Sequence, residues 1–242
     1  MLMKERLDKF ISSQTALSRR DAGKAIRDKH VSVNGAPCRA VDTKIDTDAD
    51  AVTLDGRPLT YRRYVYYMLY KPEGVVSATE DRTEKTVLEL LPAAYRRDGI
   101  FPAGRLDKDT TGLLILTDDG DYAHRMLSPK KHVEKTYVAT LDRVPDASIT
   151  DAFRKGITLS DGAVCKPGQA VCLGGCRAEV TISEGKYHQV KRMFAALGYK
   201  VTALERVRIG GLFLDRSLKK GDIRPLTEEE AALVFADPPT DN

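Results

Sequence analysis

Long apolar runs are missing from this sequence of 242 residues. No stretch approaches the roughly 20 apolar residues that cross a bilayer. The first ten residues, MLMKERLDKF, also lack the apolar segment of a secretory signal peptide. These absences argue against a membrane or exported protein and predict a cytoplasmic one. A hydrophobic content of 42% is still enough to bury a sizeable core in one or two domains.

Cysteine is scarce too, and the four residues present are Cys38, Cys165, Cys172 and Cys176. Only the last two are close together, and CLGGC lacks the paired spacing of a structural zinc site, so we expect small buried thiols. A glycine loop for a nucleotide and a cluster of metal ligands are also missing. The sequence therefore predicts neither a metal nor another cofactor.

Charge is almost balanced, with 39 Lys and Arg against 35 Asp and Glu, but it is unevenly distributed. Residues 1–40 hold nine basic and four acidic side chains, a surplus of five, and residues 184–225 hold ten and four, a surplus of six. Neutralisation of phosphates by basic side chains is the main source of affinity for nucleic acids. Two separate basic segments therefore predict a polyanionic partner that is contacted at two places.

The first sixty residues predict a small unit of two helices and a sheet. Leu7, Phe10 and Ile11 share one helix face, and SRRD at 18–21 has the spacing that begins a second helix, with Ala22, Ala25 and Ile26 facing inward. The alternating stretches VSVNG (31–35) and AVTLDG (51–56) predict strands that end in hairpin turns. Most basic residues of the unit lie on or near its helices, which gives it a positive side.

The polar stretch TYRRY at 60–64 predicts a domain junction, so we expect domains at 1–60 and 61–242. The second part mixes strands and helices, which indicates an α+β fold or an irregular α/β fold. Its predicted strands are 65–70, 112–117, 135–141, 177–183 and 199–209. Its predicted helices are 119–127, 146–156, 186–198 and 227–235, the last with a capping box in TEEE. Disorder is expected only at the end, in residues 236–242.

The stretch AGRLDKDTTGLLILTDDG at 103–120 holds the most chemically suggestive residues. Its aspartates match part of a calcium-loop template, but the apolar run 113–116 does not fit a solvated coordination loop. DKDTT matches an aspartyl-phosphate pattern, but the apolar strand follows the aspartates instead of leading into them. Two interpretations stay open from the residues alone: a carboxylate that acts as nucleophile or base, and an Asp that caps a turn.

Longer motifs resemble two known families. ERLDKFISSQTALSRRDAGKAIRDKHVSVNG, with the residues up to about 60, resembles an S4 RNA-binding domain. The 103–120 stretch resembles the signature of the pseudouridine synthases, and MLYKPEGVVS (68–77), EKTYVATL (134–141), ISEGKYHQVKRMFAALG (182–198) and the segment 205–230 resemble further motifs of that family. The resemblance implies an α+β protein: a small S4-like domain, then a larger domain on a mixed, mainly antiparallel sheet with flanking helices.

The resemblance also implies roles for individual residues. Asp107 matches the essential aspartate, Tyr137 the tyrosine that packs on a flipped base, and Arg105 the residue that fills the gap left in the RNA. Lys186 is the candidate cation that pairs with Asp107, although many relatives are expected to carry arginine there. We treat Asp109 and Asp118 as turn or cap residues and His188 as structural. Further candidate RNA contacts are the basic residues Arg19, Arg20, Lys24, Lys191 and Arg192.

The expected activity is isomerisation of one uridine in small-subunit ribosomal RNA, as in the branch that modifies uridine 516. The expected partner is 16S ribosomal RNA, either free or within an assembling subunit, with no membrane and no second subunit. Two alternatives stay open: a synthase that acts on large-subunit RNA, and a non-catalytic RNA-binding protein for ribosome assembly.

Overall fold

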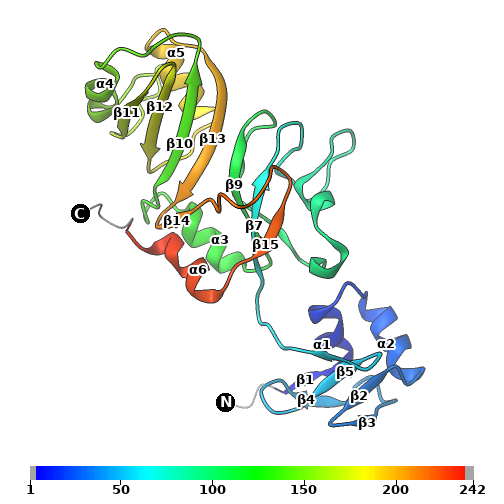
Figure 1. Cartoon of the computed structure of the whole chain (residues 1–242). Helices are drawn as coiled ribbons and strands as arrows, with labels where there is room; N and C mark the ends of the chain where they lie inside the picture. The colour runs from blue at the N-terminus through cyan, green and yellow to red at the C-terminus, as the bar shows by residue number, and fades with distance from the viewer. Residues whose placement is uncertain (1–3, 238–242) are drawn as a thin grey trace. The chain divides into compact units, whose positions relative to one another are not determined.

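The computed structural model describes residues 4–237, so residues 238–242 of the segment that we expected to be disordered lie outside the described chain. The contacts divide the protein into two compact units (Figure 1). The first runs to Val65 and includes Leu91–Ile100, and the second holds Tyr66–Leu90 and the chain from Phe101 onward. This is the α+β organisation that the sequence predicted.

The first unit combines two helices with two small antiparallel sheets. Helix α1 is Leu7–Gln14, and α2 is Arg19–Arg27. Helix α2 begins as predicted, because the Ser18 hydroxyl accepts a hydrogen bond from Asp21 N (3.2 Å). One sheet pairs β1 (Lys4–Arg6) with β4 (Lys44–Asp46), and the other has the order β3-β2-β5-β6, with β2 Val31–Val33, β3 Ala36–Pro37, β5 Val52–Leu54 and β6 Arg57–Leu59.

The predicted inner faces and turns of this unit are confirmed. Its core holds Leu7, Phe10, Ile11, Ala22, Ile26, Val31, Ile45 and Val52. Asn34-Gly35 and Asp55-Gly56 have positive φ at both residues, as a tight two-residue hairpin requires. A short 3-10 helix, η2 (Ala93–Tyr95), lies in the segment 91–100.

The second unit is built on a nine-stranded mixed sheet with the order β11-β12-β10-β13-β9-β7-β15, in which β8 and β14 pair with β9 and β13. Only β13 and β9 run parallel, and the remaining pairs are antiparallel. The strands are β7 Tyr66–Lys71, β8 Phe101–Ala103, β9 Thr111–Thr117, β10 Lys135–Leu141, β11 Gln169–Gly174, β12 Arg177–Ile182, β13 Val201–Ile209, β14 Leu212–Phe213 and β15 Ile223–Pro225.

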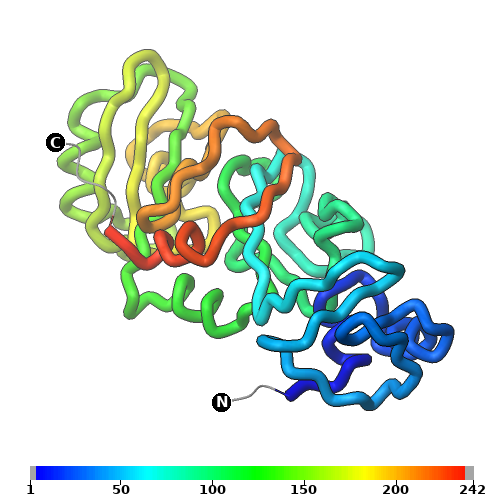
Figure 2. The backbone as a smooth tube through the Cα atoms, turned by 60° about the horizontal axis from the view of Figure 1, so that its bottom comes forward, coloured from blue at the N-terminus to red at the C-terminus, as the bar shows by residue number. Residues whose placement is uncertain are grey.

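Helices cover the two halves of this sheet and enclose separate cores. Helices α4 (Ile149–Lys155) and α5 (Gln189–Ala196) pack near β10, β11 and β12, around Phe153 and Phe194. Helices α3 (Gly120–Leu127) and α6 (Glu228–Ala232) pack near β7 and β9. The 3-10 helices η1 (Val87–Leu90) and η3 (Leu233–Phe235) complete the unit. The segment of α6 and η3 lies beside α3 (Figures 1 and 2), and the rings of Tyr122 and Phe235 meet edge to face with their centroids 5.1 Å apart.

Two predictions need correction. The helix expected from residue 186 begins at Gln189, because His188 adopts a left-handed conformation (φ 48°) and residues 184–188 form a loop. The cysteines are not all buried. Cys165 is buried, whereas Cys172 is exposed on the edge strand β11, which has a neighbour on one side only.

The parallel contact between β9 and β13 depends on Gly112. Gly112 has φ +109°, and it pairs with Arg206. A Cβ at this position would lie 2.2 Å from the Arg206 carbonyl oxygen and 2.5 Å from its nitrogen. No side chain fits there, so glycine lets the two strands meet.

We expect Gly112→Ala to lower the free energy of unfolding by about 3 kcal/mol, because both its φ and its contact with β13 would be strained. Gly120→Ala is the matched control, since Gly120 has ordinary φ and no atom within 4 Å of an added Cβ. Urea denaturation of both variants measures the difference. Equal stability of the two variants would contradict this account of the β9–β13 contact.

Candidate active site

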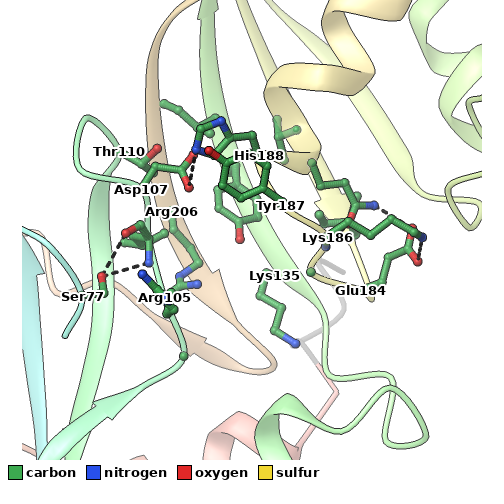
Figure 3. A pocket seen from close by; sticks show the side chains of 18 of the residues that line it. Ser77, Arg105, Asp107, Thr110, Lys135, Glu184, Lys186, Tyr187, His188 and Arg206 are labelled. Carbon is green, nitrogen blue, oxygen red and sulfur yellow. Dashed lines mark hydrogen bonds and ion pairs between the residues drawn. The ribbon is translucent and has the colours of Figure 1, made fainter. Parts of the chain in front are cut away.

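A cavity of about 600 Å³ opens in the second unit, between the loop before β9, the loop before α5 and the strands β10 and β13. Arg105, Asp107, Tyr137 and Lys186 all line it, so the structure brings together the four residues that the sequence predicted for the reaction centre (Figure 3). Three of the stretches that form it, 104–110, 135–137 and 182–190, lie within the motifs that the sequence analysis identified.

The loop that carries Asp107 is fixed by buried hydrogen bonds. The Ser77 hydroxyl donates to Leu106 O and accepts from Leu106 N, both at 3.0 Å (Figure 3). Thr110 N donates to Asp107 O across the turn (3.0 Å). The Asp107 side chain is partly exposed, and it borders the cavity. The loop thus holds this carboxylate in place while leaving it accessible.

Lys71, the last residue of β7, also fixes this loop through hydrogen bonds. Its side chain is completely buried, and Nζ donates to four carbonyl oxygens: those of Pro72 (3.0 Å), Asp107 (3.0 Å), Lys108 (3.3 Å) and Thr110 (2.9 Å). Burial lowers the pKa of Lys71 to about 8. Carbonyl dipoles replace the water that a lysine normally needs, so Lys71 supports the loop without contacting the cavity chemistry.

Two basic side chains lie beside the Asp107 carboxylate. Lys191 Nζ is 3.3 Å from Oδ2, and His188 Nε2 is 3.5 Å from Oδ1. Lys191 also pairs with Asp109 (2.5 Å), and this hydrogen bond lowers the pKa of Asp109. The ammonium thus bridges two carboxylates, and it favours the ionised form of Asp109.

The pairing that we predicted for Lys186 is wrong. Its ammonium forms an ion pair with Glu184, and Gln189 Nε2 donates to the same carboxylate (2.7 Å). The cause is the left-handed turn at His188, which ends the loop and begins α5. Lys186 lies before this turn, whereas Lys191 lies in the first turn of the helix and reaches Asp107. His188, which we treated as structural, also faces Asp107 and stacks on Tyr187 (ring centroids 3.8 Å).

Three further cationic residues of the cavity were missed: Lys108, Lys135 and Arg206. Arg206 on β13 is 4% exposed, and Lys135 on β10 donates to Val133 O (2.7 Å) and Met126 O (3.4 Å). Burial lowers the pKa of Lys135 to about 8. A basic residue between the apolar positions of a strand was the available signal, in VTALERVRI and EKTYVATL. Their partners depend on strand pairing, which the sequence pattern did not specify.

The remaining predicted RNA contacts divide between the units. Arg19, Arg20 and Lys24 are exposed on α2 in the first unit, where Arg19 pairs with Asp8 (3.0 Å). Arg192 on α5 pairs with Asp161 (2.5 Å) in the second unit. Within residues 4–237, no group of three metal-ligating side chains is found. In the same range, no helix is long and apolar enough to cross a membrane.

Comparison with known proteins identifies the class. Residues 65–196 match the model of the RNA pseudouridylate synthase family, and residues 5–52 match the S4 domain. The match covers more than half of the chain and includes the loop of Asp107. The chain therefore belongs to the RNA pseudouridylate synthase family, and it is an RNA pseudouridine synthase with an N-terminal S4 domain.

Individual relatives are similar along almost the whole chain. Ribosomal small subunit pseudouridine synthase A of Escherichia coli K12 is 46% identical, over 95% of this chain and 99% of the relative. An uncharacterized RNA pseudouridine synthase of Bacillus subtilis, YtzG, is 43% identical over 95% and 98%. A crystal structure of a pseudouridylate synthase superposes with a TM-score of 0.66 at 42% identity, over 95% of this chain and 99% of that one.

Replacement of Lys71 tests its support of the loop. We expect Lys71→Met to lower the free energy of unfolding by about 3 kcal/mol, because the carbonyl groups of Pro72 and Thr110 lose the Lys71 donor, and those of Asp107 and Lys108 lose one of two donors. The Thr110 amide, which bonds to Asp107 O, should then exchange its hydrogen faster. Lys220→Met is the control, since Lys220 forms an exposed pair with Glu73. Unchanged stability and exchange in Lys71→Met would refute the supporting role.

Proposed function

We propose that this enzyme converts one uridine of small-subunit ribosomal RNA, uridine 516, to pseudouridine, with Asp107 as the catalyst. The substrate assignment is supported by the name of the E. coli relative, which aligns with nearly the whole chain. The observation that carries the catalytic assignment is the position of Asp107: a fixed loop holds its carboxylate beside Lys191 at a cavity that Tyr137 also lines.

The reaction breaks the bond between N1 of the base and C1′ of the ribose, turns the base and forms a bond from C5 to C1′. No electron carrier or external group is needed, because the atoms of the substrate are only rearranged. The ionised Asp107 acts on the sugar or the base and assists the proton transfers. Three routes remain open for the carboxylate: attack on C1′, addition to the ring, and removal of a sugar proton.

The target base has to leave its stack before it can reach Asp107, which costs a few kcal/mol. We propose that Tyr137, half-buried in the cavity wall, stacks on the flipped base. Arg105 is exposed at the cavity, two residues before Asp107, and its planar guanidinium fills the space that the base vacates. Lys186, held by Glu184, lines the same cavity, and Arg192 lies on α5 beside Asp161; we propose that both bind the RNA backbone.

The S4 domain supplies the second RNA contact through Arg19, Arg20 and Lys24 on α2. We assign residues 1–60 to RNA binding and residues 61–242 to catalysis, a division close to the boundary of the first compact unit at Val65. In this proposal the enzyme works as a cytoplasmic monomer without a cofactor. The two basic segments of the sequence then belong to the two domains, and each contacts the ribosomal RNA.

Tritium release from 16S ribosomal RNA labelled at C5 of uridine tests the activity and the role of Asp107 together. The parent enzyme should release one equivalent per RNA, and Asp107→Asn should reduce the rate by at least about 10³-fold, because the carboxylate takes part in the chemistry. Asp109→Asn is the control, with less than about a tenfold loss. Mapping of the new pseudouridine identifies the nucleotide.

Three results would contradict this proposal. Release from 23S but not 16S RNA would move the substrate to the large subunit, and no release from any ribosomal RNA or assembling particle would favour a non-catalytic binding protein. Full activity of Asp107→Asn would remove the catalytic assignment.

Separate replacement of Lys191 and Lys186 tests the ion pair between Lys191 and Asp107. Lys191→Met should slow tritium release by about 10²-fold, because the Asp107 carboxylate loses the ammonium that lies beside it. Lys186→Met should slow it less than about tenfold, since Lys186 pairs with Glu184. Single-turnover rates at saturating RNA measure both. A larger loss in Lys186→Met would restore the original pairing.

A further inference from the structure

Arg206 is a buried cation whose charge has no partner among the residues that the structure describes. Its side chain is 4% exposed, and Nε donates to Leu113 O (2.8 Å). Within residues 4–237, Nη2 has no hydrogen-bond partner, and the guanidinium forms no ion pair. A buried arginine normally needs a carboxylate or several acceptors to offset its loss of hydration. Because Arg206 also lines the cavity, the missing acceptor points to a ligand.

Strand pairing places Arg206 directly beside the proposed base-stacking residue. In the antiparallel pair β10–β13, Tyr137 is opposite Arg206, and Thr136 is opposite Arg208. The register shifts between these pairs, which leaves Val207 as an extra residue in β13. Successive residues of β10 point to opposite faces, so Arg206 shares the face of Tyr137, whereas Arg208 shares that of Thr136. The bulge therefore directs one of two neighbouring arginines into the cavity wall.

The two arginines differ in the hydrogen-bond and ion-pair partners that the protein gives them. Arg208 donates from Nε to Thr136 Oγ1 (3.0 Å) and from Nη1 to Gly210 O (2.7 Å), and it pairs with Glu134 (3.3 Å). It is also buried, at 8% exposure, but it does not line the cavity. Arg208 is thus a structural arginine, and it is a matched reference for Arg206 on the same strand.

A second buried cation, Lys135, lies near Arg206. After burial, the charge of Arg206 is a cause of the lowered pKa of Lys135. The nearby carboxylates are already engaged, because Asp107 faces Lys191 and His188, and Glu184 pairs with Lys186. A group that becomes negative in this part of the cavity would therefore be strongly stabilised.

We propose that Arg206 binds a carbonyl oxygen of the flipped uracil and stabilises the negative charge that forms on the base when the N1–C1′ bond breaks. This inference rests on the proposed function. The electron pair of the broken bond stays on the uracil and spreads over O2 and O4, while C1′ either bonds to Asp107 or becomes part of a double bond after Asp107 takes the C2′ proton. The pair is used again when C5 bonds to C1′: in the first case the bond between C1′ and Asp107 breaks, and in the second Asp107 returns the proton to C2′. C5 then loses its own proton.

The base is a better ligand for Arg206 than a phosphate of the RNA. A flipped nucleotide enters a cavity with its base first, so its phosphates stay near the mouth, where Arg105 is exposed. Arg206 is almost fully buried and lies opposite Tyr137, whose ring stacks on the base (Figure 3 labels Arg206 among the residues that line the cavity). A contact with the base made in the transition state changes the rate, whereas a phosphate contact changes the affinity.

Single-turnover tritium release at saturating 16S RNA, together with RNA affinity, tests the proposal. Arg206→Met should release tritium about 10²-fold or more slowly than the parent, and Arg206→Lys should lose less because it keeps the charge. The dissociation constant for RNA, measured with and without Arg206→Met in the Asp107→Asn background, should change less than twofold. Arg208→Met is the control, and it should react at the parent's rate at a temperature where it is folded.

Stability gives an independent readout. Arg206→Met should be destabilised less than Arg208→Met in urea, because it removes a cation that the protein leaves unpaired. The proposal is overturned by a rate of Arg206→Met within threefold of the parent's, by a loss that lies in RNA affinity alone, or by a greater destabilisation than that of Arg208→Met. Absence of tritium release from the parent would refute the proposed function itself.

Discussion

The hydrogen bonds of Lys71 are the constraint on which the reaction centre depends. One buried ammonium joins the end of β7 to three carbonyl groups of the loop that carries Asp107. A loop of this kind would otherwise leave its polar backbone groups exposed to exchange with water, and its carboxylate would vary in position. Positioning within fractions of an ångström is what makes a side chain effective in catalysis. Lys71 therefore fixes the backbone of the loop, and through it the position of the partly exposed Asp107 carboxylate.

Close contact between β9 and β13 places the other half of the site. Gly112 directly follows the Asp107 loop, and its missing side chain admits the backbone of Arg206. The same residue of β13 lies opposite Tyr137 of β10, so one strand connects the carboxylate loop with the proposed stacking residue. The sheet also separates two cores, one near α4 and α5 and one near α3 and α6. The cavity lies where these halves join, which is where residues distant in sequence can converge.

Local patterns predicted most of the fold, whereas long-range pairing did not follow from them. Alternation and capping residues located α2, the hairpins of the first unit and the strands β7, β9, β10, β12 and β13, because those signals act within a few residues. Motif resemblance selected Asp107 over Asp109. The choice of Lys186 over Lys191 was wrong because it depends on one left-handed residue, His188, that moves the start of α5 by three positions. Lys71 and Arg206 escaped notice because their roles come from partners more than 30 residues away.

Lys71 and Arg206 show two different uses of a buried cation in one site: Lys71 stabilises a loop, and Arg206 is proposed to act on the substrate. Both are buried cations near Asp107, and both lose their hydration on folding. Four backbone oxygens replace the hydration of the Lys71 ammonium, so it has no free N–H donor for a substrate. Arg206 keeps an unused donor at the cavity, and the folded protein carries that cost until a substrate supplies the acceptor. Unsatisfied buried charge is therefore the feature that distinguishes a group prepared for the reaction from one that holds the loop in place.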